Sequence, residues 1–291
     1  MSSGSLAWMA ERHPDAHFTI ACGPACAPLF SAMPQLKTLI PLHKKPYHGH
    51  WLGLWKHTVG TAWQSVVDIR SSGLAYLLRS GERRIYRPQK HDTRPKAAQI
   101  ATGLGIAPVP YGKIWFTEEH LRNAESLGRG ELRRTVVLCP KANWVGKEWP
   151  VEHYAALGRQ LHRDLGAVIA VLGTEAQAAA MEPIANALPK SSFLNLCGKT
   201  DLLTAAALLS QSMLFIGNDS GMMHLAAATG CPTLGLFGPT NDAVYGPWGK
   251  KTAVIRCPEP WDKLFDPKAK ESLMSTLDVE DVYQSAMLLA G

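Results

Sequence analysis

The 291-residue sequence contains no apolar run of about 20 residues, which is the length that a membrane-spanning helix needs. Its amino terminus lacks a basic flank followed by a long apolar run, so the sequence predicts no secretory signal. It also has no internal repeat and no low-complexity tract. These absences favour a soluble globular protein in the cytoplasm, long enough for one large domain or two smaller ones.

Cysteine is scarce and irregularly spaced. Cys22 and Cys26 form the only close pair among the six cysteines, and no second pair completes a zinc-binding set. We therefore expect reduced, mostly buried thiols and no metal site.

Acidic residues are few in the first part of the chain. Residues 1–130 hold 16 Lys and Arg against 8 Asp and Glu, whereas residues 131–291 hold 14 against 16. This contrast predicts two domains, with the first facing an anionic partner. The densest basic stretch, 70–96, is either a solvated surface or a contact for a phosphorylated glycolipid, a membrane surface or nucleic acid. No nucleic-acid recognition motif accompanies it, so nucleic acid is the least expected of these partners.

The second half alternates between apolar strands and helices. We predict strands over 135–140, 167–173, 192–196, 213–217 and 232–238, and helices over 150–166, 174–188, 201–211 and 220–230. Strands without polar alternation that are separated by helices indicate a parallel sheet covered on both faces, in a doubly wound domain.

The first half follows a weaker version of the same plan. We predict strands over 18–22, 65–69 and 83–87, and helices over 5–12, 51–63, 72–79 and 95–104. Prolines and glycines gather in 106–134, so we place the domain boundary near residue 130. The expected architecture is α/β, with two doubly wound, Rossmann-like domains that face each other across a cleft.

Ligands of an open parallel sheet bind beyond the carboxyl ends of its strands, and three such ends carry polar residues. Lys147 follows the first strand of the second half, Glu175 follows the next, and "GNDSGMMH" (217–224) follows the fourth. The helix that begins near Ser220 offers unpaired N–H groups and a positive dipole end, which suit a phosphate or diphosphate. Gly221 allows a bulky anion to approach the backbone closely.

Each of these residues also has an ordinary structural interpretation. Asp219 or Ser220 is a common helix cap, a single histidine such as His224 is often only packed, Lys147 is an ordinary exposed lysine, and Glu175 can cap a helix. Asp219 is an unsuitable ligand for an anion. It fits better as a cap, as a partner of His224, or as an acceptor for sugar hydroxyls or amines. The convergence of these residues on one rim favours a ligand site.

Three segments resemble the ADP-heptose:lipopolysaccharide heptosyltransferase family, glycosyltransferase family 9. They are "CPKANWVGKEWPVEHYAALGRQL", "VLGTEAQ" and "GNDSGMMHLAAATGCPTLGLFGPT", and the resemblance is strongest over 135–249. It implies a GT-B fold with an acceptor-side domain (1–130) and a nucleotide-sugar domain (131–291) whose last helix packs back on the first. It further implies an ADP-heptose donor, inverted configuration in the product, no obligatory metal and no cofactor. The acceptor would be an anionic glycolipid of the lipopolysaccharide core, at the inner face of the inner membrane.

The resemblance also implies roles for individual residues. Lys147 would contact the donor phosphate and stabilise the leaving diphosphate, and Glu175 would lie near the ribose. Asp219 would touch the heptose, while the residues facing the diphosphate would be Ser220, Gly221, Met222 and His224.

The start of the chain departs from the family pattern. Family members begin with an apolar strand and a Gly-Asp loop whose aspartate is the presumed general base, and here the resemblance starts at the following helix. Neither Glu11 nor Asp15 is expected to replace that base. The start is expected to be shortened. The alternatives are a nucleotide-sugar or glycolipid binder without transferase activity, or a GT-B-like nucleotide-sugar epimerase.

The segment "HKKPYHGHWLGLW" (43–55) combines histidines with aromatic residues. Its irregular spacing does not favour a metal site, and we expect an acceptor-side loop. Trp51, Trp55 and Trp63 are expected to pack inside the protein, with contact to a membrane surface as the alternative.

Overall fold

The computed structural model describes all 291 residues, and the chain divides into two compact units, Met1–Trp115 and Phe116–Gly291. The boundary expected near residue 130 lies within the second unit, in the turn after helix α4 (Glu118–Leu127). The roles expected of the two domains stay predictions.

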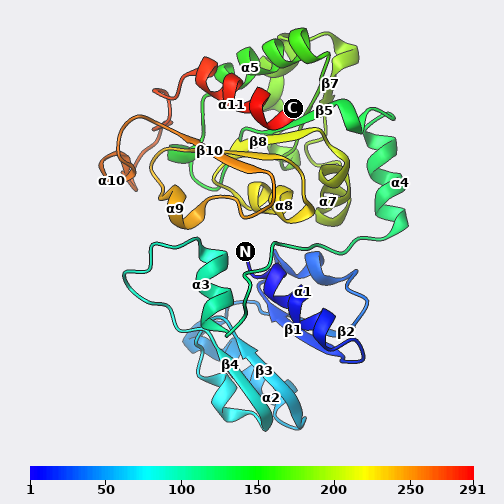
Figure 1. Ribbon diagram of the computed structural model, residues 1–291, viewed down its shortest axis with the longest axis vertical. Coiled ribbons are helices and arrows are strands. Elements are labelled where there is room, and N and C mark those ends of the chain that lie inside the picture. Colours follow the sequence, from blue (N-terminus) through cyan, green and yellow to red (C-terminus); the bar gives the residue numbers. More distant parts are fainter. The chain divides into compact units, whose positions relative to one another are not determined.

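The second unit is built on six parallel strands in the order β10-β9-β8-β5-β6-β7 (Figure 1). Their bounds are β5 (Thr135–Cys139), β6 (Val168–Val171), β7 (Phe193–Asn195), β8 (Leu214–Asn218), β9 (Thr233–Phe237) and β10 (Thr252–Arg256). Every residue of β5, β6, β8 and β9 is buried, because helices cover both faces of the sheet. The predicted parallel, doubly wound sheet is confirmed.

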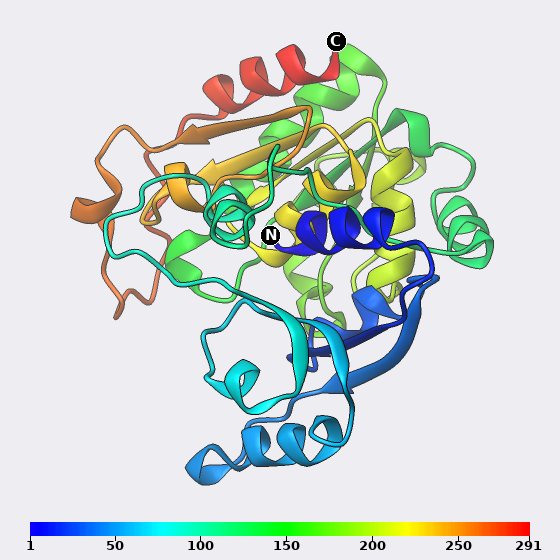
Figure 2. The ribbon, with the colours of Figure 1, turned by 60° about the horizontal axis from the view of Figure 1, so that its bottom comes forward.

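Helices α5 (Val151–Leu165) and α11 (Val279–Ala290) lie side by side over one face of this sheet in both Figure 1 and Figure 2. They share the main core with alternate residues of β5, β6, β8 and β9. Helices α7 (Leu202–Gln211) and α8 (Gly221–Thr229) cover the opposite face. A contact of α11 with the first unit stays a prediction.

The helix ends follow their sequence signals. Asp201 caps α7 by accepting a hydrogen bond from the backbone N–H of Thr204 at 2.7 Å. Gly166 and Gly230 end α5 and α8 with φ of +61° and +85°, a region that favours glycine.

The helix predicted over 174–188 is wrong as a continuous element. The segment forms two 3₁₀ turns, Glu175–Gln177 and Ala179–Met181, followed by the short helix α6 (Glu182–Asn186). Pro183 has no backbone N–H, so it cannot continue a helix from the residues before it. The remaining helices of the unit, which were not predicted, are α9 (Asp242–Tyr245) and α10 (Trp261–Leu264).

The first unit contains two separate two-stranded parallel sheets instead of one continuous sheet. One pairs β1 (Phe18–Cys22) with β2 (Leu36–Pro41), and the other pairs β3 (Trp63–Asp68) with β4 (Ser80–Ile85). Three helices accompany them, α1 (Ser3–Arg12), α2 (Gly49–Thr58) and α3 (Lys96–Gly103). Strand β2 was not predicted.

The helix predicted over 72–79 is also wrong, because only a 3₁₀ turn, Leu74–Leu77, forms there. Gly73 precedes this turn at a φ of +79° and Ser80 already belongs to β4, which leaves no room for a longer helix.

None of the helices is both long enough and apolar enough to cross a membrane. All six cysteines are free thiols and four of them are buried, as expected. Burial raises the pKa of Cys139 to about 12, so this thiol at the end of β5 stays protonated.

Candidate active site

In the sheet of the second unit, the order in which the chain adds strands reverses between β5 and β8. From β5 the chain moves outward through β6 and β7, and then returns to place β8 on the other side of β5. The loops after β5 and β8 therefore diverge at a topological switch point, which is where open α/β sheets bind ligands.

Lys147 and Asp219 meet across this switch point. The Nζ atom of Lys147 donates to the backbone oxygen of Asp219 at 2.8 Å and lies 3.2 Å from its carboxylate Oδ2. The side chains are only 14% and 13% exposed, so this ion pair is less screened by water than a surface pair. The contact ties the loop after β5 to the start of the segment after β8.

Asn218, the last residue of β8, is completely buried and holds the same two segments together. Its Oδ1 accepts from the backbone N–H of Trp149 at 3.1 Å and from the hydroxyl of Tyr154 at 3.0 Å. Its Nδ2 donates to the backbone oxygen of Pro140 at 2.8 Å. Sequence reasoning missed this residue, although a polar amide at the end of the apolar run "LFIGN" was the available signal.

The Lys147 loop is supported from behind by the segment before α11. Trp149 is 1% exposed and donates its Nε1–H to the backbone oxygen of Leu277 at 2.9 Å. The hydroxyl of Ser272 donates to the backbone oxygen of Glu148 at 2.6 Å. The carboxylate of Glu148 in turn pairs with Lys141 at 2.7 Å. Trp149 thus anchors the loop, and this anchoring limits where Lys147 can point.

The amino terminus of α8 is open at the carboxyl edge of the sheet. Ser220 is the N-cap, yet its buried side chain makes no capping hydrogen bond. The first N–H groups of the helix have no partner within it. A methyl group added at Gly221 would meet no atom within 4 Å. Space is therefore open beside the backbone of Gly221, where the first N–H groups of α8 can meet an anion.

Asp219 is not the cap of α8, so that structural interpretation is wrong. Its backbone N–H donates to Leu236 at 3.2 Å and its side chain pairs with Lys147. His224 follows one turn into α8. Burial lowers its pKa to about 4, and the nearby Asp219 opposes the shift only in part. The imidazole is therefore neutral at pH 7 and can donate one hydrogen bond.

Glu175 lies at the end of β6, the strand beside β5, with an exposed side chain that makes no ion pair. Gly198 approaches it closely, because a Cβ added there would lie 2.6 Å from the Cβ of Glu175. The structure thus places Lys147, Glu175 and the start of α8 at three adjacent strand ends of one sheet. The binding roles of all these residues stay predictions.

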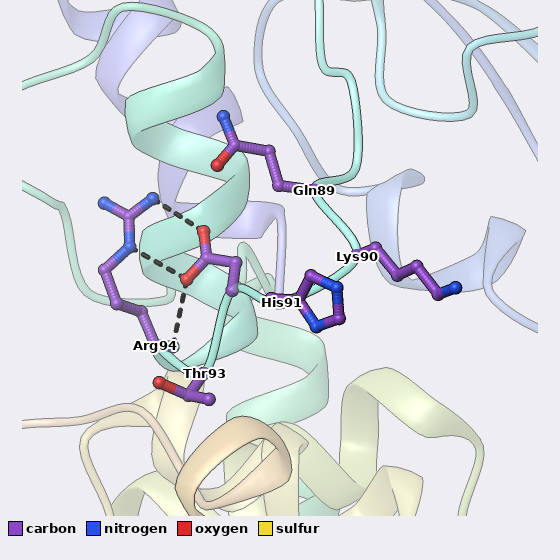
Figure 3. Close-up of a pocket in the computed structure, with 6 residues that line it drawn as sticks. Gln89, Lys90, His91, Thr93 and Arg94 are labelled. Carbon is purple, nitrogen blue, oxygen red and sulfur yellow. Dashed lines mark hydrogen bonds and ion pairs between the residues drawn. The ribbon is translucent and has the colours of Figure 1, made fainter.

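A hollow of about 420 Å³ lies in the first unit and is lined by residues 89–94 alone. The guanidinium of Arg94, which is labelled in Figure 3, donates two hydrogen bonds to the carboxylate of Asp92, the shorter one at 2.6 Å. The lining comes from a single loop, and its only carboxylate is the one already paired with Arg94.

Comparison with known proteins decides the family. The family model of glycosyltransferase family 9 (heptosyltransferase) matches residues 97–273, which is more than half of the chain. The chain belongs to glycosyltransferase family 9. The predictions of this family and of the glycosyltransferase class are thereby confirmed.

One curated relative of this family 9 chain is lipooligosaccharide heptosyltransferase 2 of Haemophilus influenzae, 34% identical over 160 residues. That match spans 51% of the chain and 46% of the relative, so it covers about half of the relative's length.

Two solved structures share the fold. A family 9 glycosyltransferase of Veillonella parvula superposes with a TM-score of 0.78 at 20% identity, covering 99% of this chain and 92% of the other. The ADP-heptose LPS heptosyltransferase II of Escherichia coli does so with a TM-score of 0.73 at 22% identity, covering 99% and 94%. The predicted α/β, GT-B fold class is confirmed.

Proposed function

We propose that this family 9 protein is an inverting transferase that moves heptose, or a similar sugar, from an ADP-sugar to a lipopolysaccharide core or related glycolipid. The names of its relatives support the reaction, since one is a lipooligosaccharide heptosyltransferase and another an ADP-heptose LPS heptosyltransferase. The acceptor is proposed to be anionic and carried at the cytoplasmic face of the inner membrane.

The donor site is proposed to lie at the switch point of the second unit. The diphosphate is proposed to occupy the amino terminus of α8, beside the N–H groups of Gly221 and Met222 and near the hydroxyl of Ser220. The observation that carries the proposal is the Lys147–Asp219 pair, which fixes a cation next to that open helix end.

Lys147 and Asp219 are proposed to have different roles in binding the donor. With Lys147 held between Oδ2 of Asp219 and the diphosphate, the other carboxylate oxygen of Asp219 is proposed to accept hydrogen bonds from hydroxyls of the heptose. Glu175, exposed two strand positions from β8, is proposed to lie near the ribose.

The chemistry depends on stabilising the leaving group. When the bond between the sugar and ADP breaks, negative charge accumulates on the diphosphate. Lys147, the dipole of α8 and a hydrogen bond from neutral His224 face that charge from fixed positions, so they need little reorganisation during the reaction.

Calorimetry with ADP and ADP-heptose tests the site. We expect Lys147→Ala to weaken ADP binding by about 10- to 100-fold, the value of a hydrogen bond to a charged group. The exposed Lys250 provides the control, and Lys250→Ala should bind ADP like the unaltered protein. Equal affinities for all three proteins would contradict the site. Tight ADP-heptose binding without transfer to any lipopolysaccharide core would instead favour the non-catalytic binder.

A further inference from the structure

The proposed donor site leaves unexplained the segment 43–59, which connects β2 to β3 and includes α2. Fourteen large apolar side chains of the molecule are conspicuously exposed, and half of them fall between residues 47 and 77. Three belong to the segment itself: Tyr47 is fully exposed, Leu52 is 56% exposed and Val59 is 38% exposed. Exposed apolar groups that gather in one part of a chain can mark an interaction surface.

Tyr47 is presented by a strained turn. Tyr47 and His48 both adopt positive φ, at 52° and 58°, although neither is glycine. Each residue in this region is disfavoured by roughly 1–2 kcal/mol, because its Cβ crowds the carbonyl oxygen. The turn therefore holds an aromatic ring in solvent at an energetic cost that the fold itself does not explain.

Helix α2 separates its side chains into two faces. Leu54 and Thr58 are buried, and Trp51 and Trp55 are half-buried beside them. Leu52, Lys56 and Val59 recur at the spacing of one helix face and are exposed. Trp63, which is also half-buried, donates its Nε1–H to the backbone oxygen of Thr58 at 3.0 Å. The three tryptophans are thus half-buried, so their packing inside the protein stays a prediction, and the most exposed apolar groups are other residues.

Positive charge exceeds negative charge in the part of the chain that holds these apolar groups. Residues 37–96 hold twelve Lys and Arg against three Asp and Glu. Each of the three acids is already engaged: Asp68 accepts from Ser72 at 2.8 Å, Glu82 pairs with Arg84, and Asp92 pairs with Arg94. The lysines of the segment make no ion pair, and they are Lys44, Lys45 and Lys56.

We propose that segment 43–59 is a docking surface for an anionic lipid bilayer, with Tyr47, Leu52 and Val59 entering the interface and the lysines facing lipid headgroups. Interfacial helices bind membranes through this combination of apolar insertion and cations. Nucleic acid is a poorer match, because aliphatic side chains such as Leu52 and Val59 offer no ring for stacking on bases. The inference extends the proposed function, since a membrane-borne acceptor requires a protein at the bilayer, but it does not depend on the donor.

Cosedimentation with vesicles tests the docking surface. We expect the full chain to bind vesicles containing phosphatidylglycerol, to bind pure phosphatidylcholine vesicles much less, and to be released by salt. Each lysine near an anionic surface contributes about 1 kcal/mol, so Lys44→Ala with Lys45→Ala should weaken binding about 30-fold. Leu52→Ser should weaken it by about tenfold through lost apolar burial.

Matched variants of the second unit serve as controls. Lys250→Ala with Lys251→Ala removes another adjacent pair of exposed lysines, and Leu288→Ser removes an apolar side chain that is 85% exposed. Both should bind vesicles like the unaltered protein. Circular dichroism and ADP calorimetry on every variant separate a lost surface from lost folding, and from failure of the donor site.

Three results would overturn the inference. The first is no preference for anionic vesicles, and the second is equal weakening by the control variants. The third is a protein that does not bind vesicles but does bind single-stranded RNA in a gel-shift assay, and that loses this RNA binding when Lys44 and Lys45 are replaced by alanine.

Discussion

Asn218→Ala is expected to loosen the candidate site and to destabilise the second unit. The substitution removes a fully buried amide that makes three hydrogen bonds. The groups that it bonds, on Trp149, Tyr154 and Pro140, lose this partner. An unsatisfied buried group costs roughly 1–3 kcal/mol. The Tyr154 hydroxyl lies 3.5 Å from the backbone oxygen of Cys139 and can recover part of its loss there. We therefore expect a loss of about 3–5 kcal/mol in the free energy of unfolding.

Urea denaturation measures the free energy of unfolding, and calorimetry measures the affinity of the candidate site for ADP. Because Asn218 joins the Lys147 loop to the start of α8, ADP affinity should fall along with stability. Leu161→Ala is the matched control: Leu161 is fully buried in α5, and its truncation should cost about 2–5 kcal/mol without touching either loop.

The reasoning fails if Asn218→Ala loses less than about 1 kcal/mol, the value of one ordinary hydrogen bond. It also fails if Leu161→Ala weakens ADP binding as much as Asn218→Ala does. Asn218→Asp provides a second check. It keeps the shape but turns an oxygen toward the backbone oxygen of Pro140, so it should be destabilising as well.

Three further predictions concern single residues around the site. Gly221→Ala should leave stability unchanged or raised in urea, because the added methyl meets no atom and alanine favours the helix, yet it should weaken ADP binding if the anion approaches that backbone. Equal ADP affinity would argue against this approach. His224 has a folded-state pKa near 4, below its unfolded value, so its contribution to stability is present above about pH 6.5 and is lost as the pH falls toward 4. In the His224→Gln variant the free energy of unfolding should change less with pH over that window, and an unchanged slope would refute the neutral state of this half-buried imidazole. Gly198→Ala should destabilise by about 1 kcal/mol or more, because it combines a φ of +73° with a 2.6 Å contact to Glu175, and a neutral effect in denaturation would contradict that crowding.

Much of the second unit was predictable because local signals agree with the tertiary fold there. Strands such as β5 and β8 are buried on both faces and read as short apolar runs, and Asp201, Gly166 and Gly230 mark helix ends through the geometry of the backbone itself. The first unit was less predictable. Its four strands form two small sheets with partly exposed faces, so their residues carry weaker patterns, and β2 escaped prediction.

The sequence by itself determined which residues stand at the strand ends, since Lys147, Glu175, Asp219 and Ser220 each follow an apolar run. Only the tertiary structure decided which of them meet. The strand order brings β8 beside β5, so Lys147 contacts Asp219 although 72 positions separate them, and Asn218 is buried between their loops. Contacts of that kind depend on sheet topology and on the removal of water, and neither can be read from the spacing of residues along the chain.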